Sequence, residues 1–391
     1  MRQLVLGVDA GGTASRAALF TVDGAPVGRG HAPGANPVTL GMDQACAHVT
    51  AAVQEAAAAF LPHVSAVVLG LAGNPGACRE LAARVLRPLL PQGLPVRVVG
   101  DTVTAFAAGT AAPSGTVLIS GTGAIAAKIT DHEQAATADG YGWLLGDEGS
   151  GFWLGHAAAR TTIHALATTA TRATGTLGVT SATLATRPQS SPTPSASGTP
   201  SCPPTPGRPR TPATALGPPD AEAGSGAEAR SGAGAGDGVG GGWLVAPVVR
   251  QLLPEGVGED PVAQLAAAVH ARPPLALAEL APLVSRAAEA GDPVAQALVT
   301  EAAARLASTA AQVHEPGLPI VLAGGVLTSE GPVGRAVHDL LPDAVTAGDA
   351  AGGAAWLAAR ELLPEADAQA LHAAFTKHPD RPHRTSRAAL P

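Results

Sequence analysis

Two glycine-rich turns, each between two short apolar segments, determine which architectures are open to this chain. The turns are residues 9–13, Asp-Ala-Gly-Gly-Thr, and residues 120–123, Ser-Gly-Thr-Gly. The flanking segments have the composition of β-strands and comprise residues 4–9, 16–21, 116–120 and 124–130. The same strand–turn–strand unit recurs about 110 residues along the chain, which predicts a fold of two similar halves.

Strand and helix signals alternate through the rest of the chain. The Asp23-Gly24 pair predicts a hairpin turn before a third strand. In the first half we expect strands at 25–30, 65–70 and 96–99, and helices at 42–60, 78–90 and 103–108. In the second half we expect helices at 276–290 and 293–313 and a strand at 318–323. This order predicts an α/β protein with two facing α/β halves.

Length and composition predict the domain organisation. The 391 residues exceed the usual single domain of about 100–200 residues. We expect an N-terminal domain at 1–114 and a C-terminal domain at 115–371. The segment 186–242 is rich in proline and glycine and has few large apolar side chains, so we expect a disordered insert in the C-terminal domain. Residues 372–391 lack an apolar face and are expected to form a disordered tail.

Charge and hydropathy exclude several classes of partner. The net charge is −7 and no basic block occurs, which argues against binding to nucleic acid or to an anionic membrane surface. The sequence has no run of about 18 apolar residues, which a membrane-spanning helix would require. The first residues lack the apolar core of a signal peptide, so we expect a cytoplasmic location. The expected partner is therefore a small molecule.

The chemistry of the two turns favours phosphate binding. Their glycines remove the Cβ atoms that would hold backbone N–H groups away from a phosphate, and their threonines add hydroxyl donors. A single turn of this kind is more often a plain hairpin, but the recurrence predicts two turns that hold one polyphosphate from opposite sides. The expected contacts are Gly11, Gly12, Thr13, Gly121, Thr122 and Gly123.

Positive charge for phosphoryl transfer has few sources in this sequence. The only lysines are Lys128 and Lys377, and neither lies in a P-loop motif or a protein-kinase motif. Charge on a transferred phosphate must then be neutralised by backbone N–H groups, hydroxyls and Mg²⁺. Asp9, at the end of the first strand, is the expected magnesium ligand, acting through water.

Asp101 is the candidate general base. It follows the strand at 96–99 and opens a helix, which places it at the carboxyl edge of the sheet where ligands of α/β proteins bind. A carboxylate there can accept the proton of an attacking alcohol. The residue type at this boundary equally fits a helix N-cap, so these features alone leave both interpretations open.

Six segments carry a resemblance to a known family. They occur in the same order as in N-acetylglucosamine kinases of the BadF/BadG/BcrA/BcrD ATPase-like group. The segments are residues 9–13, 70–73, 100–102, 119–123, 146–150 and 322–326. The resemblance covers nearly the whole chain apart from the insert and the tail. It implies the two-domain actin-like ATPase (ribonuclease H-like) fold, with ATP in a cleft between the duplicated halves.

The resemblance also implies roles for individual residues. Asp101 resembles the base that takes the proton of the sugar 6-hydroxyl, and Thr13 and Thr122 resemble phosphate contacts. Gly324 and Gly325 resemble the place where the adenine ring passes the backbone, although a strand-ending turn would look alike. The implied sugar contacts are Asn36, Gly140, Gly142, Trp143 and Asp147, with a buried core position as the alternative for Trp143.

These features together predict an ATP-dependent sugar kinase that uses Mg²⁺ and phosphorylates the 6-hydroxyl of N-acetylglucosamine. Ala124 and Ile125 stand where such kinases often carry polar side chains, so a related aminosugar or hexose is a second substrate class. The alternative function is a BadF-type ATPase or nucleotide-dependent regulator without sugar turnover. The sequence leaves the oligomeric state open, a homodimer included.

Overall fold

The computed structural model describes residues 3–175 and 242–377. Internal contacts divide the chain into two units, Met1–Thr171 with Gly240–Pro391, and Arg172–Val239, and the fold described below belongs to the first. The expected insert at 186–242 lies outside the described residues except for Gly242, and so does the expected tail beyond residue 377.

The first half is built on a five-stranded sheet in the order β3-β2-β1-β4-β5. Its strands are β1 (Leu4–Ala10), β2 (Ala14–Thr21), β3 (Pro26–Pro33), β4 (Val64–Leu71) and β5 (Val96–Gly100). β1 pairs antiparallel with β2 and parallel with β4. β1 is buried along its whole length, as expected of a central strand covered on both faces.

The second half repeats this arrangement. Its sheet has the order β10-β9-β6-β7-β8, and the central strand β6 again pairs antiparallel with the next strand along the chain, β7, and parallel with β9 on its other side. The strands are β6 (Gly115–Ser120), β7 (Ala124–Thr130), β8 (Glu133–Asp139), β9 (Ile320–Ala323) and β10 (Val345–Thr346). The predicted α/β fold of two similar halves is confirmed.

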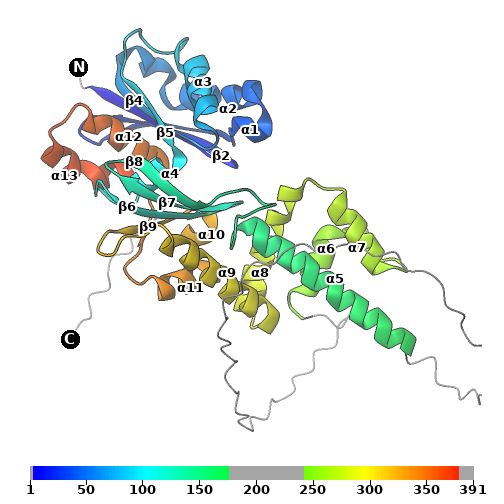
Figure 1. The fold of residues 1–391 in the computed structure, drawn as a ribbon. Helices are drawn as coiled ribbons and strands as arrows, with labels where there is room; N and C mark the ends of the chain where they lie inside the picture. The colour runs from blue at the N-terminus through cyan, green and yellow to red at the C-terminus, as the bar shows by residue number, and fades with distance from the viewer. Residues whose placement is uncertain (1–2, 176–241, 378–391) are drawn as a thin grey trace, which may run out of the picture. The chain divides into compact units, whose positions relative to one another are not determined.

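Helices connect and cover the two sheets (Figure 1). In the first half they are α1 (Pro37–Leu40), α2 (Met42–Ala57), a 3₁₀ segment (Ala58–His63), α3 (Pro75–Leu86) and α4 (Asp101–Ala107). In the second half they are α5 (Gly151–Gly175), α6 (Val245–Leu252), α7 (Pro261–His270), a 3₁₀ segment (Pro274–Leu280), α8 (Ala281–Glu289), α9 (Pro293–Ala311), α10 (Gly325–Thr328), α11 (Pro332–Leu340), α12 (Ala350–Arg360) and α13 (Glu365–Thr376). Within the described ranges, none is both long and apolar enough to cross a membrane.

Small residues let the two halves approach each other closely. α12 follows the last strand of the second half but packs against β1 and β4 of the first. A Cβ placed on Gly7 of β1 would lie 2.1 Å from the carbonyl oxygen of Ala351 and 2.2 Å from the backbone nitrogen of Ala355. The alanine- and glycine-rich sequence of α12 is therefore a packing requirement at this contact.

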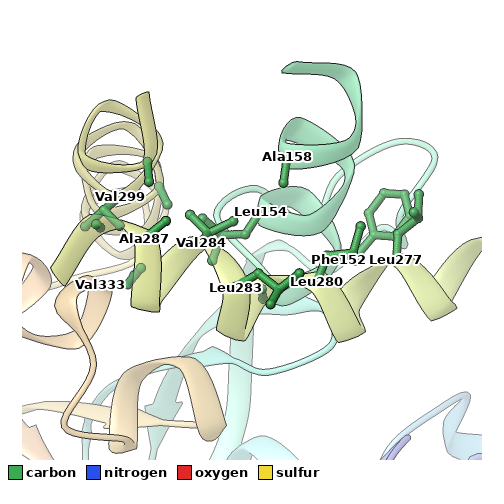
Figure 2. Close-up of a cluster of buried hydrophobic side chains, with 14 of the residues drawn as sticks. Phe152, Leu154, Ala158, Leu277, Leu280, Leu283, Val284, Ala287, Val299 and Val333 are labelled. Carbon is green, nitrogen blue, oxygen red and sulfur yellow. The ribbon is translucent and has the colours of Figure 1, made fainter. Parts of the chain in front are cut away.

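The second half also contains a helical core. Figure 2 shows apolar side chains of α5 and α8 facing one another, including Leu154, Ala158 and Val284, with Val299 of α9 and Val333 of α11 beside them. Phe152, in the first turn of α5, belongs to the same cluster. This packing holds the start of α5 in place, directly after the segment that includes the predicted sugar contacts.

The expected tail boundary at residue 372 is wrong. α13 continues to Thr376, and Phe375 is fully buried with its ring centroid 4.9 Å from that of Phe20. His372 Nε2 lies 2.7 Å from the carbonyl oxygen of Ala107. These contacts come from other elements, so they leave no local pattern in the sequence of the last turn.

Candidate functional site

The two glycine-rich turns meet in the folded chain. The hydroxyl oxygens of Thr13 and Thr122 lie 3.0 Å apart and share a hydrogen bond. Thr13 is exposed and Thr122 is half-buried. Each half of the chain therefore places a threonine hydroxyl at the same solvent-accessible point.

Backbone hydrogen bonds give the first turn a defined orientation. The N–H of Gly11 donates to the carbonyl oxygen of Ala14 at 3.0 Å, and the carbonyl oxygen of Gly11 accepts from Ala35 at 3.0 Å. A trans peptide directs its C=O and N–H to opposite sides, so the N–H of Gly12 points away from Ala35. Among the described residues, the N–H groups of Gly12 and Thr13 have no hydrogen-bond partner.

The second turn has the same design. The N–H of Gly121 donates to the carbonyl oxygen of Gly123 at 2.9 Å. The carbonyl oxygens of Gly121 and Thr122 accept from Gly151 at 2.8 Å and from Phe152 at 3.1 Å, the first residues of α5. The N–H groups of Thr122 and Gly123 therefore point away from α5, and within the described part of the chain they have no partner.

The two turns together offer four unpaired N–H groups and two hydroxyls. A Cβ on Gly12 or on Gly121 would meet nothing within 4 Å, so open space adjoins both turns. Clusters of unpaired backbone N–H groups bind anions, because their partial positive charges converge. This arrangement is suited to a phosphate chain, which would replace the hydrogen bond between the two threonines.

Two carboxylates lie close to each other beside the first turn. Asp9 is the penultimate residue of β1 and is buried, and its Oδ1 accepts a hydrogen bond of 2.8 Å from the hydroxyl of Thr104. That hydroxyl also lies 3.0 Å from the carbonyl oxygen of Asp101. Burial and the nearby charge of Asp101 raise the pKa of Asp9 to about 7. Burial raises the pKa of Asp101 to about 6, against the lowering effect of the N–H of Thr102.

The residues fit a divalent cation bound largely through water and phosphate. Asp9 and Asp101, two neighbouring carboxylates with raised pKa values, repel each other when ionised, and a cation beside them would relieve that repulsion. In the described ranges no cluster of three or more metal-ligating side chains occurs. Mg²⁺ commonly binds through one or two carboxylates with water and phosphate oxygens, which agrees with a site of this kind.

Asp101 does not occupy the N-cap position of α4. That position is Gly100, and no side chain caps the helix there. Asp101 is the first helical residue and is half-buried. The position thus leaves the carboxylate available for chemistry, although its role as a base stays a prediction.

Arg16 is a candidate phosphate contact that the sequence reading missed. It pairs directly with Asp9 across the β1–β2 ladder, so both side chains lie on the same face of the sheet. The Arg16 side chain is exposed and forms no ion pair among the described residues. The signal available in the sequence was strand alternation: Arg16 lies on the second strand opposite Asp9 once the turn between them is recognised.

Asn36 uses its side-chain oxygen locally. It caps α1, with Oδ1 accepting from the N–H of Val38 at 2.9 Å. The same oxygen would lie 3.1 Å from a Cβ on Gly73, so the two loops are in contact. The amide nitrogen of Asn36 remains the group that a ligand can use.

The predicted sugar segment forms a tightly held loop. Gly140 and Gly142 adopt left-handed φ values of 78° and 83°. The carboxylate of Asp139 accepts from three backbone N–H groups, those of Gly140, Asp147 and Glu148, at 2.7, 2.7 and 2.8 Å. Asp139 was not predicted as a site residue, because its partners are backbone atoms that a sequence motif does not reveal.

Asp147 joins this loop to the second glycine-rich turn. Its Oδ1 accepts from the N–H of Ala124 at 3.2 Å, and its side chain is buried. A Cβ on Gly123 would lie 2.9 Å from Oδ2 of Asp147, so a larger residue there would displace the Asp147 side chain. Burial raises the pKa of Asp147. Asp147 thus positions the turn directly, whatever its contact with a sugar.

Trp143 is not a core residue. Its side chain is 40% exposed, and its ring centroid lies 5.6 Å from that of Phe152. The ring therefore rests on the first turn of α5 and keeps one part of its surface in solvent.

The strand-ending turn at Gly324 lies against the second glycine-rich turn. Gly324 has φ 83° and ψ 151°, and a Cβ on it would lie 2.4 Å from the carbonyl oxygen of Ser120. A Cβ on Gly325 would meet nothing within 4 Å. The segment predicted to pass the adenine ring thus contacts the turn predicted to hold phosphate.

We expect Gly324→Ala to lower the free energy of unfolding by roughly 3 kcal/mol, because the backbone conformation is nearly restricted to glycine and the new Cβ would collide with Ser120. The matched control, Gly325→Ala, adds the same methyl group in open space and should change stability by less than about 0.5 kcal/mol. Urea denaturation of both variants measures the difference. Equal effects would contradict the close contact.

Two cavities of the second half lie away from these residues. One of about 400 Å³ is lined by residues of α6 and α8, and another of about 620 Å³ adjoins β9 and the end of α11. Neither is lined by a predicted site residue. The structure brings together the two turns, Asp9, Asp101 and Gly324, but gives no direct contact between Asn36 or Trp143 and Asp101.

Comparison with known proteins agrees with this geometry. The model of the BadF/BadG/BcrA/BcrD ATPase family matches residues 6–350. A candidate N-acetylglucosamine kinase from Chromobacterium violaceum has a similar structure, with a TM-score of 0.59 and 23% identity over 91% of this chain and 99% of that one. A candidate N-acetylglucosamine kinase from Porphyromonas gingivalis has a TM-score of 0.59 and 18% identity over 92% and 100%. These likenesses establish the fold.

Proposed function

The chain belongs to the BadF/BadG/BcrA/BcrD ATPase family, and from this premise we propose that it is an ATP-dependent sugar kinase. The reaction proposed is phosphoryl transfer to the 6-hydroxyl of N-acetylglucosamine or of a related aminosugar or hexose. The observation that carries the proposal is the meeting of the two glycine-rich turns at Thr13 and Thr122, with four unpaired N–H groups around them. In this account the two domains that hold the substrates are residues 1–114 and the chain from residue 115 to the end of α13 at Thr376.

The phosphate chain of ATP would lie between the turns. The N–H groups of Gly12, Thr13, Thr122 and Gly123 donate to its oxygens, and the two threonine hydroxyls turn from each other to the phosphates. Gly11 and Gly121 would close the two turns. The backbone at Gly324 and Gly325 would lie beside the adenine ring. Arg16, on the same sheet face as Asp9, adds positive charge near the transferred group.

Asp101 would act as the general base. Its carboxylate accepts the proton of the 6-hydroxyl while the new oxygen–phosphorus bond forms and the bond to the ADP oxygen breaks in line with it. When bound, Mg²⁺ would supply charge that neutralises the phosphate oxygens, and Asp9 would hold it through water. The proton ends on Asp101 and returns to solvent after the products leave.

The sugar would bind between the loops of both halves. The amide nitrogen of Asn36 donates to one hydroxyl, the backbone at Gly140 and Gly142 contacts the ring, and Trp143 covers an apolar face. Asp147 reaches the sugar with Oδ2, the oxygen that Ala124 does not use. Holding the alcohol near the γ-phosphate supplies much of the rate enhancement, because bound reactants need no encounter.

We expect kcat/KM for the sugar to fall about tenfold per pH unit on the acid side, with an apparent pKa near 6. Burial raises the pKa of Asp101 to about 6, and only the ionised carboxylate can accept a proton. Asp9 interacts with Asp101, so the acid side of the pH profile reports the titration of the two carboxylates as a pair. Initial rates between pH 5 and 8 measure it. A profile that is flat through this range would contradict the assignment.

A coupled assay of ADP release over a panel of hexoses and aminosugars tests the proposed function. We expect ADP formation that depends on the sugar, with N-acetylglucosamine among the best acceptors. Failure of every sugar at millimolar concentration would refute the proposal. ADP release at the same rate without sugar would instead support a family ATPase that regulates another protein.

A further inference from the structure

An exposed apolar surface lies within the loop predicted to contact the sugar. Four of the fourteen large apolar side chains that are exposed in the described part of the chain fall between residues 141 and 145. They are Tyr141 at 67% exposure, Trp143 at 40%, Leu144 at 73% and Leu145 at 78%. Leu145 is the most exposed of all fourteen. We call these four side chains the apolar loop surface. Concentrated exposure of this kind marks a binding site more often than scattered exposure does.

The loop that carries this surface is held firmly. The N–H groups of Leu145 and Gly146 both donate to the carbonyl oxygen of Gly142, at 3.0 and 2.8 Å. Asp139 binds three further backbone N–H groups at both ends of the loop. The apolar side chains are thus presented to solvent by an ordered backbone, which lowers the entropy cost of binding a ligand.

The apolar loop surface is continuous with the proposed active site. Trp143 contacts Phe152, and the N–H of Phe152 donates to the carbonyl oxygen of Thr122 in the second turn. Asp147, at the end of the loop, holds the N–H of Ala124 directly after the same turn. A substrate bound beside the second turn would therefore have the loop next to it.

Most carboxylate oxygens in this region are already occupied by backbone N–H groups. The carboxylate of Asp139 is used by backbone N–H groups, and one oxygen of Asp147 is used by Ala124. Ile125 packs against the loop, with Cδ1 2.7 Å from the place of a Cβ on Gly140. Tyr141 and Trp143 each carry one polar group, but Leu144 and Leu145 carry none, so the part of a ligand that lies on these two leucines gains by apolar burial.

The size of the surface argues against a protein partner. A stable protein interface covers about 800 Å² per partner and includes about 20–30 residues on each side. Four side chains on one short loop are far fewer, but they suffice to cover a single substituent of a small molecule.

We infer that the preferred acceptor is an aminosugar whose nitrogen carries an acyl chain longer than acetyl, with the chain lying on the apolar loop surface. This inference rests on the proposed function, since it names the acceptor of the same reaction. The reaction itself is unchanged: the 6-hydroxyl takes the phosphoryl group, and the acyl chain takes no part in bond formation.

The test compares kcat/KM for glucose and for glucosamine bearing acetyl, butanoyl and hexanoyl groups. Each buried methylene should raise kcat/KM about fourfold, so the butanoyl compound should exceed the acetyl compound by about fifteenfold. Leu144→Ser and Leu145→Ser should flatten this dependence. The matched control, Leu340→Ser, alters a leucine of similar kind that is 52% exposed on α11 and should leave the dependence intact.

The outcomes separate this inference from the proposed function. A flat or falling series with measurable turnover of acetylglucosamine or glucose would overturn the inference and leave the kinase activity standing. A rising series that Leu144→Ser and Leu145→Ser do not alter would show that the acyl chain binds elsewhere, and this result would also overturn the inference. Absence of turnover with every acceptor would refute the proposed function and this inference with it.

Discussion

The Asp101→Asn variant should show a kcat lower by on the order of 10²–10⁴ while ATP binds with unchanged affinity. The amide has nearly the same shape as the carboxylate but cannot accept the proton of the alcohol. The start of α4 should survive the change, because Gly100 rather than Asp101 holds the N-cap position. Steady-state kinetics and calorimetric titration of nucleotide measure the two quantities separately.

Asp43→Asn is the matched control for this variant. Asp43 also stands in the first turn of a helix, α2, but its side chain is 98% exposed and far more open to solvent than that of Asp101. The control should keep normal kcat. A near-normal kcat in Asp101→Asn would reduce Asp101 to a residue of the helix terminus and remove the proposed base.

The Asp9→Asn variant should lose activity and gain stability. Loss of the magnesium-holding carboxylate should lower kcat by about 10² or more. In metal-free buffer at pH 8 the free energy of unfolding should rise by on the order of 4 kcal/mol, because the pKa of Asp9 is raised from 3.8 to about 7 and each pKa unit corresponds to about 1.4 kcal/mol. The hydrogen bond from Thr104 can persist, since the asparagine oxygen also accepts.

The pH dependence of this gain follows from the direction of the pKa shift. Burial and the charge of Asp101 raise the pKa of Asp9 from 3.8 to about 7 in the folded chain. Ionised Asp9 therefore destabilises the fold, with no penalty below the unfolded pKa and the full penalty above about pH 7. Urea denaturation at pH 5 and pH 8 should give the larger gain at pH 8. Equal gains at both pH values would contradict a raised pKa.

Local signals made much of the fold predictable. Glycine turns between apolar segments identified β1, β2, β6 and β7, because a hairpin depends on neighbouring residues. β8 (Glu133–Asp139) was not expected, since its sequence has almost no β-branched residues and it forms through pairing with β7. The helix expected at 42–60 ends as an α-helix at Ala57 and continues as a 3₁₀ segment that contains Pro62.

The site residues that could be predicted are those whose place follows from the end of a strand or from a turn. Asp9 and the glycine turns follow from the ends of strands, and the family resemblance placed Asp101. Thr104 and Arg16 were missed, because the hydrogen bond from Thr104 to Asp9 depends on a packed helix and the place of Arg16 opposite Asp9 depends on strand register. Asp139 was missed because it binds backbone N–H groups of a loop whose shape the sequence does not encode locally.

Following the γ-phosphate of labelled ATP tests the central claim most directly. We predict that the label moves to a sugar 6-phosphate, one equivalent for each ADP formed, and that little is released as inorganic phosphate when the sugar is present. Label that appears only as inorganic phosphate, at a rate that the sugar does not change, would contradict the claim that this site transfers phosphate to a sugar.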